Sequence, residues 1–305
     1  MDLTGKVAVV TGSGQGLGLA YAQELARRGA AVVINDVRQE TADAAVAGIT
    51  AAGGRAVAVV APVGTTATAI ALVDAAVATF GRLDIMVTNA GILRDKVLWK
   101  MSDDDFDAVI DVHLRGTFTC VRAAVERFRE QGQGGRLICI GSPAGQRGNF
   151  GQTNYSAAKA AIVGMVRTWA MELKKAGITA NAVCPVAATA MTETIPFLAP
   201  YIEGMRAGEP LPAVIRREVG MGTPGDVAGV IAFLASDAAS DVTGQAISIG
   251  GDRLALWSHP QLTATAFHDG GFSADDVAAQ WPTTFAGRLE SVGEEFPAEL
   301  TGAAR

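Results

Sequence analysis

Tyr155 and Lys159 lie four residues apart in the segment Asn-Tyr-Ser-Ala-Ala-Lys, and Ser142 lies thirteen residues upstream. In a helix, positions i and i+4 share one face, so the lysine ammonium would lie close to the tyrosine ring. A nearby cation favours the phenolate, and a phenol whose pKa falls below about 10 exchanges protons more readily with an alcohol or ketone near neutral pH. The same spacing also occurs on ordinary surface helices. The rest of the chain must decide between acid–base chemistry and a solvated helix face.

The elements that would position these side chains follow from an alternation of apolar runs and helical patterns. Predicted strands cover residues 7–11, 31–36, 56–60, 85–89, 136–141, 179–184 and 246–249. Predicted helices cover residues 17–28, 40–52, 66–79, 103–130, 152–176 and 225–236. Strands that alternate with helices form parallel sheets through right-handed crossovers. The predicted fold class is therefore α/β, with one doubly wound domain and a seven-stranded parallel sheet.

Two regions lie outside this alternation. Residues 186–222 hold four prolines and connect the predicted strand 179–184 to the predicted helix 225–236. This composition indicates an ordered loop able to act as a lid. Residues 1–251 show no linker and are predicted to be one domain. Residues 252–305 form a C-terminal extension with helical patterns over 273–280 and 285–294, which we expect to pack on the core or on a neighbouring subunit.

Composition excludes several classes of function. The chain has 305 residues, of which 49% are hydrophobic, and its formal net charge is −6, so nucleic acid and anionic membranes are poor partners. The three cysteines lie in apolar runs, which predicts buried thiols in a reducing compartment. The N-terminus lacks the pattern of a signal peptide and no apolar run is long enough to span a membrane, so we expect a cytoplasmic protein. The acids at 103–105 are interpreted as the start of a helix, and no metal site is expected.

A glycine-rich loop follows the first predicted strand. Gly12, Gly16 and Gly18 fit the spacing G-x-x-x-G-x-G, with Leu17 between the last two. A loop of this kind turns sharply, lets a pyrophosphate approach the backbone, and directs a helix N-terminus at it. A purely structural turn is the alternative, but the position between a strand and a helix favours a dinucleotide site.

An acidic residue ends the second predicted strand. Asp36 lies where a carboxylate accepts hydrogen bonds from the adenosine ribose and repels a 2′-phosphate, which favours NAD over NADP. Arg38 is a counter-argument, because an arginine there accommodates the extra phosphate.

These motifs, taken together in order, resemble the short-chain dehydrogenase/reductase family over roughly residues 4–251. The other motifs on which this resemblance rests are Asn89-Ala90-Gly91, Asn181 to Pro185, Thr223 to Asp226, Thr243 to Gln245 and Gly250-Gly251. The resemblance implies a Rossmann-type domain in which Tyr155 is the general acid/base, Lys159 lowers the pKa of that tyrosine and binds the nicotinamide ribose, and Ser142 holds the substrate oxygen. It further implies that Asn89 and Gly91 line the nicotinamide ribose and that Thr189 contacts the carboxamide.

The chain departs from the family pattern at three places. His113 stands where most members have an asparagine that supports a proton relay; it either does similar work or is a satisfied helix residue. Ala-Pro-Val at 61–63 stands where many members have an aspartate that binds the adenine amino group. Adenine would therefore be recognised by the backbone and by apolar contact with Val63. The segment from Val186 to Thr192 lacks the common Pro-Gly start. This variation is similar to the (3R)-hydroxyacyl-CoA dehydrogenase unit of multifunctional enzymes and its bacterial relatives.

The leading functional hypothesis is an NAD-dependent oxidoreductase that interconverts a secondary alcohol and a ketone. An acyl-thioester substrate such as a 3-hydroxyacyl-CoA comes first, and a hydroxysteroid or another hydrophobic alcohol second, since the loop 186–222 is rich in apolar side chains. The alternatives are an NADPH-dependent 3-oxoacyl thioester reductase and a catalytically idle dinucleotide-binding protein. The resemblance also implies a homodimer or homotetramer, with Ala157, Ala161, Met165 and Trp169 on the interface helix or, alternatively, buried in their own subunit.

Overall fold

The structure is a computed structural model, and it describes residues 1–188, 198–294, 296–297 and 300. Eight strands form one sheet in the order β3-β2-β1-β4-β5-β6-β7-β8. The first seven are parallel: β1 (Val7–Val10), β2 (Ala31–Asp36), β3 (Arg55–Val60), β4 (Ile85–Thr88), β5 (Gly135–Ile140), β6 (Ile178–Pro185) and β7 (Ala246–Gly250). All seven predicted strands are confirmed to within a residue or two at their ends.

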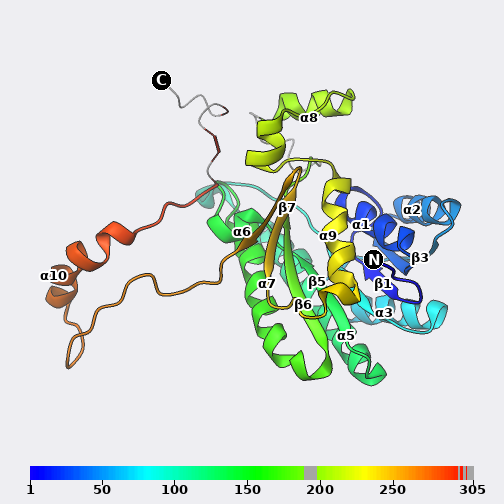
Figure 1. Ribbon diagram of the computed structural model, residues 1–305, viewed down its shortest axis with the longest axis horizontal. Coiled ribbons are helices and arrows are strands. Elements are labelled where there is room, and N and C mark those ends of the chain that lie inside the picture. The colour runs from blue at the N-terminus through cyan, green and yellow to red at the C-terminus, as the bar shows by residue number, and fades with distance from the viewer. Residues whose placement is uncertain (189–197, 295, 298–299, 301–305) are drawn as a thin grey trace.

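Helices cover both faces of the sheet (Figure 1). One core lies under α1 (Gly16–Arg27), α2 (Gln39–Ala51) and α9 (Pro224–Ala235). The other lies under α3 (Thr66–Phe80), α5 (Gly116–Gln131) and α7 (Thr153–Glu172). Central strands such as β1 are buried along their whole length, because helices cover them on both sides. The doubly wound α/β fold is confirmed.

The predicted helix 103–130 is three consecutive pieces. They are α4 (Asp103–Ile110), a π-helical turn over Asp111–Arg115, and α5. Ser102 and Asp105 form a capping box at the start of α4, as interpreted from the acidic run. The π-turn contains His113, and such turns are frequent at functional sites.

An eighth strand corrects the predicted sheet of seven. β8 (Arg253–Trp257) folds back from β7 as an antiparallel hairpin partner, with Ser248 opposite Ala255. The predicted boundary after residue 251 leaves the sequence Arg-Leu-Ala-Leu-Trp in the C-terminal extension. The turn at 251–252 is short enough for a hairpin, and Gly251 has φ +52, a conformation that glycine tolerates.

The loop 186–222 contains ordered structure that the sequence reading missed. Helix α8 (Ala199–Arg206) begins with Pro200 in its first turn, and a π-helical turn covers Ile215–Val219. Their apolar side chains form a third core, which we call the lid cluster: Ala188, Leu198, Ile202, Ile215, Val219 and Met221. Met191, Ile195 and Phe197 lie outside the described residues.

The C-terminal extension leaves the body as an arm. After β8 it runs outward through α10 (Ala274–Thr284) and a short turn over Ala286–Arg288 (Figure 1). The predicted helix 273–280 is confirmed as part of α10, whereas a helix over 285–294 is wrong: Gly287 disfavours it, and Leu289 and Val292 are exposed rather than packed. The arm returns to the body at Gly293, whose N–H donates to the Arg147 carbonyl at 2.7 Å. None of the described helices is long and apolar enough to cross a membrane.

Candidate active site

Ser142 is positioned by the short helix α6 (Pro143–Arg147), which packs closely against helix α7. Ser142 caps this helix at the carboxyl end of β5, and its Oγ accepts from the Ala144 N–H at 3.2 Å. A side chain on Gly145 would lie only 2.6 Å from the Ala160 nitrogen of α7, so glycine permits α6 to rest there. Because Ser142 Oγ accepts from the backbone, its own proton remains available as a donor, to Tyr155 in this structure and to a substrate oxygen when one is bound.

Lys159 lies beneath Tyr155, as the four-residue spacing predicted. Its Nζ is 5.5 Å from the Tyr155 ring centroid and donates to the Ile140 carbonyl at 2.6 Å. The side chain is only 3% exposed. Burial lowers the Lys159 pKa to about 8, partly opposed by the buried thiols Cys184 and Cys139 nearby.

The Tyr155 pKa does not follow the prediction. Burial raises it to about 12, and a hydrogen bond with Ser142 only partly offsets that rise. The expected depression by Lys159 is therefore wrong for the protein chain itself. Desolvation of the phenolate outweighs a cation that lies below the ring and hydrogen-bonds to the Ile140 carbonyl.

Asn154 is a positioning residue that sequence reasoning missed. It is fully buried, and its Nδ2 donates to the carbonyls of Arg94 at 3.1 Å and Asp105 at 3.0 Å. Its Oδ1 accepts from the Tyr155 N–H at 2.8 Å. The amide therefore ties the loop after β4 and helix α4 to the first turn of α7. Its position directly before Tyr155 was the available signal.

His113 is a buried side chain that packs edge-on against the Tyr155 ring. The two rings are perpendicular, with centroids 5.2 Å apart, and His113 is 2% exposed. Its Nε2 lies 3.0 Å from the Ile92 nitrogen and 2.8 Å from the Ile92 oxygen, while Nδ1 is buried without a partner in the described part of the chain. Burial, followed by the charge of Lys159, lowers the His113 pKa to about 3, so the ring is neutral at physiological pH.

Gly91 makes room for this histidine. A Cβ at position 91 would overlap the His113 ring at Cε1. Gly91 and His113 thus form a single packing unit, and the smallest residue is required at position 91 for the imidazole to reach the Ile92 backbone.

The glycine loop is tightly built around two of its glycines. Side chains on Gly12 and Gly18 would collide with Ala90 and with the Gly12 carbonyl. Asn89 Nδ2 donates to the carbonyls of Thr11 and Gly12, each at 3.0 Å. Asn89 therefore fixes the loop to the end of β4, a structural task that the sequence reading had not included.

Asp36 and the loop meet at the edge of the sheet. Gly14, which was not among the predicted residues, packs against the Asp36 carboxylate, and any side chain there would strike it. Asp36 Oδ1 accepts from the Arg38 N–H at 3.1 Å, while the Arg38 guanidinium donates to Gln15 Oε1 at 2.9 Å. The carboxylate and the guanidinium therefore both lie beside the loop.

These residues fit a dinucleotide. Gly16 has φ +59 and begins α1, and the space where its Cβ would point is open. The N-cap Gln15 makes no side-chain cap, so the first N–H groups of α1 remain for an anion such as a pyrophosphate. Leu17 is partly buried on the core beneath, and Val63 packs against Gly116 at the start of α5. Thr189 lies outside the described residues.

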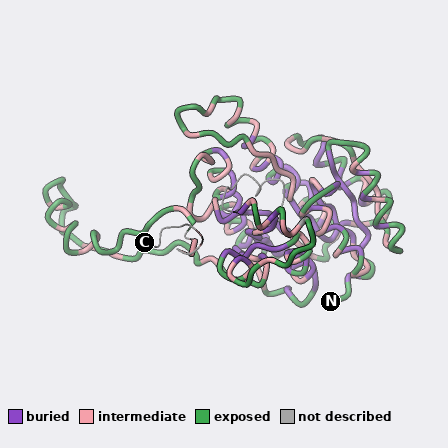
Figure 2. The backbone as a smooth tube through the Cα atoms, turned by 90° about the horizontal axis from the view of Figure 1, so that it is seen from above, coloured by how far each residue is buried: buried purple, intermediate pink, exposed green. Residues whose placement is uncertain are grey.

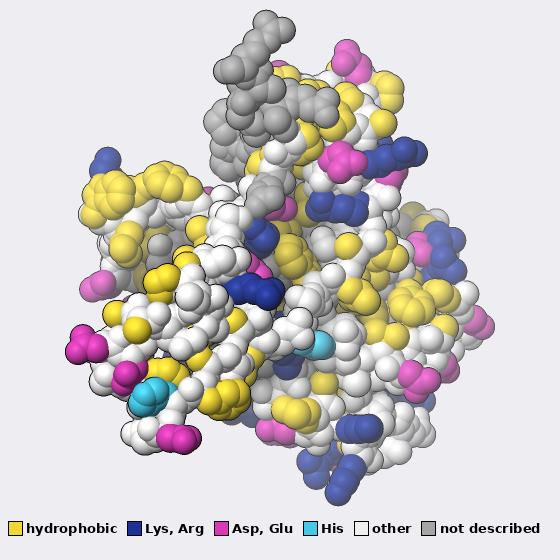
Figure 3. All heavy atoms as spheres, turned by 60° about the vertical axis from the view of Figure 1, so that its left-hand side comes forward, with side chains coloured by type: hydrophobic (Ala, Val, Ile, Leu, Met, Phe, Trp, Pro, Cys, Tyr) yellow, Lys and Arg dark blue, Asp and Glu magenta, His cyan; other side chains and the backbone are white. Residues whose placement is uncertain are grey.

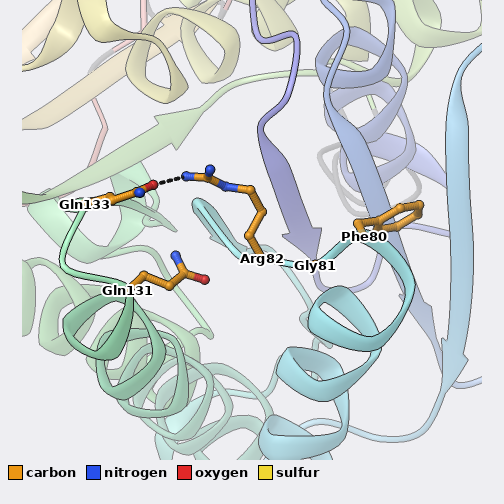
Figure 4. Close-up of a pocket in the computed structure, with 5 residues that line it drawn as sticks. All are labelled: Phe80, Gly81, Arg82, Gln131 and Gln133. Atoms are coloured by element: carbon orange, nitrogen blue, oxygen red, sulfur yellow. Dashed lines mark hydrogen bonds between the residues drawn. The ribbon is translucent and has the colours of Figure 1, made fainter.

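Two hollows lie away from this edge. One is at the amino end of the sheet, where Arg82 pairs with Asp84 and Gln133 and where Gln131 bonds the Leu83 backbone, so its polar groups are satisfied (Figure 4). The other, of about 300 Å³, lies beside the end of α6 and is lined by Arg147, Val219, Arg253, Trp257 and Phe296 among others. Arg147, which lines the second hollow, is the last residue of α6, the helix that Ser142 caps.

A family model and individual relatives of known name all place the chain in one family. The family model for short chain dehydrogenases matches residues 6–196. The chain is 41% identical over 300 residues to hydroxyacyl-CoA dehydrogenase ChsB1 of Mycobacterium tuberculosis, covering 94% of this chain and 90% of that protein. It is 43% identical over 255 residues to the 3-oxoacyl-[acyl-carrier-protein] reductase of Synechocystis, covering 82% and 97%.

This chain is also similar to part of a larger enzyme and to a solved structure. The peroxisomal multifunctional enzyme type 2 of Drosophila melanogaster is 39% identical over 246 residues, which cover 78% of this chain and 38% of that enzyme. A crystal structure of a short chain dehydrogenase from Mycobacterium avium superposes with a TM-score of 0.81 at 31% identity, covering 98% of this chain and 100% of that one.

Proposed function

The chain belongs to the short-chain dehydrogenase/reductase family, and on that premise we propose that it is an NAD-dependent oxidoreductase that interconverts a secondary alcohol and a ketone on an acyl-thioester or another hydrophobic substrate. The observation that carries the proposal is the meeting of Ser142, Tyr155 and Lys159 at the sheet edge that also holds the glycine loop. The relative named as a hydroxyacyl-CoA dehydrogenase supports the substrate class.

The chain's own residues supply binding and proton transfer. When bound, the nicotinamide supplies the hydride chemistry and, in its oxidised form, a positive charge. Ser142 donates to the substrate oxygen, and Tyr155 delivers or accepts the proton at that oxygen. Because the Tyr155 pKa is about 12 in the protein alone, the hydroxyl is protonated at neutral pH and is set to act as the acid in ketone reduction. In the direction of alcohol oxidation, a nearby cofactor cation favours the phenolate.

NAD is proposed over NADP on the placement of Asp36. The residue is 8% exposed, and its carboxylate packs against Gly14 of the loop, where it repels a 2′-phosphate. Arg38, beside Gln15, is the specific observation that favours the second candidate, an NADPH-dependent 3-oxoacyl thioester reductase. A relative named as a 3-oxoacyl-[acyl-carrier-protein] reductase supports the same alternative.

The lid cluster supports an apolar substrate. Leu198, Ile202 and Val219 belong to a hydrophobic core that stands over the end of β6, separate from the two cores of the sheet. Such a wall excludes water from the reacting centre. Arg216 is already paired with Asp252 at 2.7 Å and with Asp226 at 3.4 Å, so it is a poor candidate for binding substrate phosphates.

A homodimer or homotetramer is proposed through the outer face of α7. Ala157, Ala160, Gly164 and Met171 are exposed along that face, whereas Met165 and Trp169 pack partly into the subunit's own core. The exposed face is made mainly of small residues, which lets a second helix approach closely.

A substrate panel tests the proposal. Acyl-CoAs, steroids and small alcohols are each assayed with NAD and NADP by nicotinamide absorbance. The expected result is the highest kcat/KM with a 3-hydroxyacyl-CoA and NAD. Turnover with NADP and a 3-oxoacyl carrier-protein thioester alone would favour the second candidate, and no turnover of any CH–OH substrate would contradict both.

A further inference from the structure

Asn35 is a buried polar side chain near the end of β2 to which the proposed chemistry gives no role. It is 1% exposed and lies in the interior of the body, where Figure 2 shows buried segments surrounded by exposed ones. Its Nδ2 donates to the carbonyls of Val59 at 3.1 Å and Ala61 at 2.9 Å. Its Oδ1 accepts from the Gly12 N–H at 3.4 Å. One amide therefore joins the glycine loop after β1 to the segment that follows β3.

The segment after β3 is held at three points. The Ala61 N–H donates to the Asp36 carbonyl at 3.1 Å, and the Ala61 carbonyl accepts from Asn35. Val63 packs against Gly116, where an added Cβ would lie 2.9 Å from Val63 Cγ2. The residue between these anchors is a proline, whose ring fixes φ. Holding the Ala61 carbonyl therefore also restricts the direction of the next peptide group, which carries the Val63 N–H.

The base of a dinucleotide reaches this segment if the chain binds one as proposed. Ligands of doubly wound folds bind outside the carboxyl ends of the strands at the switch point, which here lies between β1 and β4. The pyrophosphate then lies at the start of α1, after β1, and the adenosine ribose lies at Asp36, which ends β2. The next strand outward is β3, so the base extends toward the residues that follow it.

The Val63 N–H is a free hydrogen-bond donor at this place. Pro62 has no N–H, and the Ala61 N–H is already bonded to Asp36. Among the residues that the structure describes, none accepts from the Val63 N–H, and Val63 is partly exposed. Adenine has an unprotonated N1 that accepts a hydrogen bond. Hypoxanthine carries a proton on N1, so a donor would meet a donor and the buried N–H would stay unpaired.

Apolar contact cannot make the same distinction. Val37, which is 66% exposed beside Asp36, offers apolar surface to the ring of either base. Exposed hydrophobic side chains are also frequent on the face of the molecule in Figure 3, so such surface is not peculiar to a base site. Selection between two bases of nearly the same shape depends on the hydrogen-bonding edge.

We propose that Asn35 is a positioning residue for base recognition: by holding the Ala61 carbonyl it directs the Val63 N–H at the base, and so selects adenine over a base that is protonated at N1. This inference rests on the dinucleotide site of the proposed function. Asn35 acts through the backbone after β3 and does not itself touch the cofactor.

Binding of NADH and of its deaminated analogue, reduced nicotinamide hypoxanthine dinucleotide, tests this role. Fluorescence titration gives both dissociation constants, and their ratio measures base selection separately from overall affinity. Asn35→Ala removes the amide. Asn35→Asp fills the same space and keeps the Oδ1 acceptor but replaces the Nδ2 donor, which keeps the test available if the alanine variant does not fold.

Asn181→Ala is the matched control. Asn181 is also 1% exposed and also joins two chain segments, since its Nδ2 donates to the Val242 carbonyl at 2.7 Å and its Oδ1 accepts from the Gln245 N–H at 3.1 Å. It lies on β6, in the other half of the sheet. Urea unfolding compares the stability that each substitution removes.

We expect the wild type to bind NADH at least about tenfold more tightly than the analogue, and the Asn35 variants to reduce this ratio to about threefold or less. Asn181→Ala should keep the wild-type ratio at a comparable loss of stability. A wild type without base preference, an unchanged ratio in the Asn35 variants, or an equal reduction in Asn181→Ala would overturn the role of Asn35 while leaving the dinucleotide site intact. A wild type that does not bind NADH at all would overturn both.

Discussion

The buried ammonium of Lys159 should make the wild-type protein less stable at pH 7 than the inactive variant Lys159→Met. Its pKa falls from 10.5 to about 8, chiefly because burial disfavours the charged form. A depression of this size corresponds to about 3 kcal/mol of stability lost at pH 7 relative to a lysine with an unshifted pKa. Lys159→Met removes that charge while filling a similar volume, and it should abolish turnover.

The pH dependence isolates this effect. Between pH 8 and 10.5 the unfolded chain holds a proton on Lys159 that the folded protein has lost, so wild-type stability rises with pH through that window. The loss of the hydrogen bond to Ile140 in Lys159→Met is independent of pH and cancels in the comparison. From pH 7 to pH 9.5, the wild type should gain about 2 kcal/mol relative to the variant.

Urea unfolding of both proteins at the two pH values gives the required double difference. The measurement stops at pH 9.5 because burial also raises the Tyr155 pKa to about 12, which destabilises the folded state once the unfolded tyrosine ionises near pH 10. If the difference between wild type and variant is the same at both pH values, the Lys159 ammonium is not depressed by burial and this reasoning is refuted.

Two further substitutions test other parts of the site. Asp36→Asn should lower the NADH-over-NADPH preference roughly tenfold, because the charge that repels the 2′-phosphate is lost; nicotinamide fluorescence titration measures the ratio, and an unchanged ratio would contradict the role of Asp36. Gly91→Ala should destabilise the protein by about 1–3 kcal/mol, because its methyl group overlaps the His113 ring, and His113→Ala in the same chain should recover much of that loss in urea unfolding; equal stability of Gly91→Ala and wild type would show that the ring is not confined there.

Sequence patterns predicted what depends on local spacing. Strand and helix periods located β1 to β7, and the four-residue step placed Lys159 beneath Tyr155 as expected. Gly12 and Gly18 were recognisable because close backbone approach excludes every other residue. These features are encoded within a few neighbouring positions, so one sequence is sufficient to read them.

Features that depend on distant contacts were not predictable in this way. Asn154 and Gly14 gain their roles from Arg94, Asp105 and Asp36, which are far away along the chain. The Tyr155 pKa depends on how deeply the fold buries the phenol, and the spacing to Lys159 carries no information on that burial. β8 was missed because its hairpin partner is decided by the free edge of β7, a tertiary property.

The central claim is that Tyr155 transfers the proton while the chain holds a dinucleotide independently of it. Tyr155→Phe retains the ring that faces His113 and Lys159 and removes only the hydroxyl. With a confirmed substrate, single-turnover rates should fall about 10²–10⁴-fold while the NADH dissociation constant stays within twofold of the wild type. A variant that turns over at the wild-type rate would contradict the account.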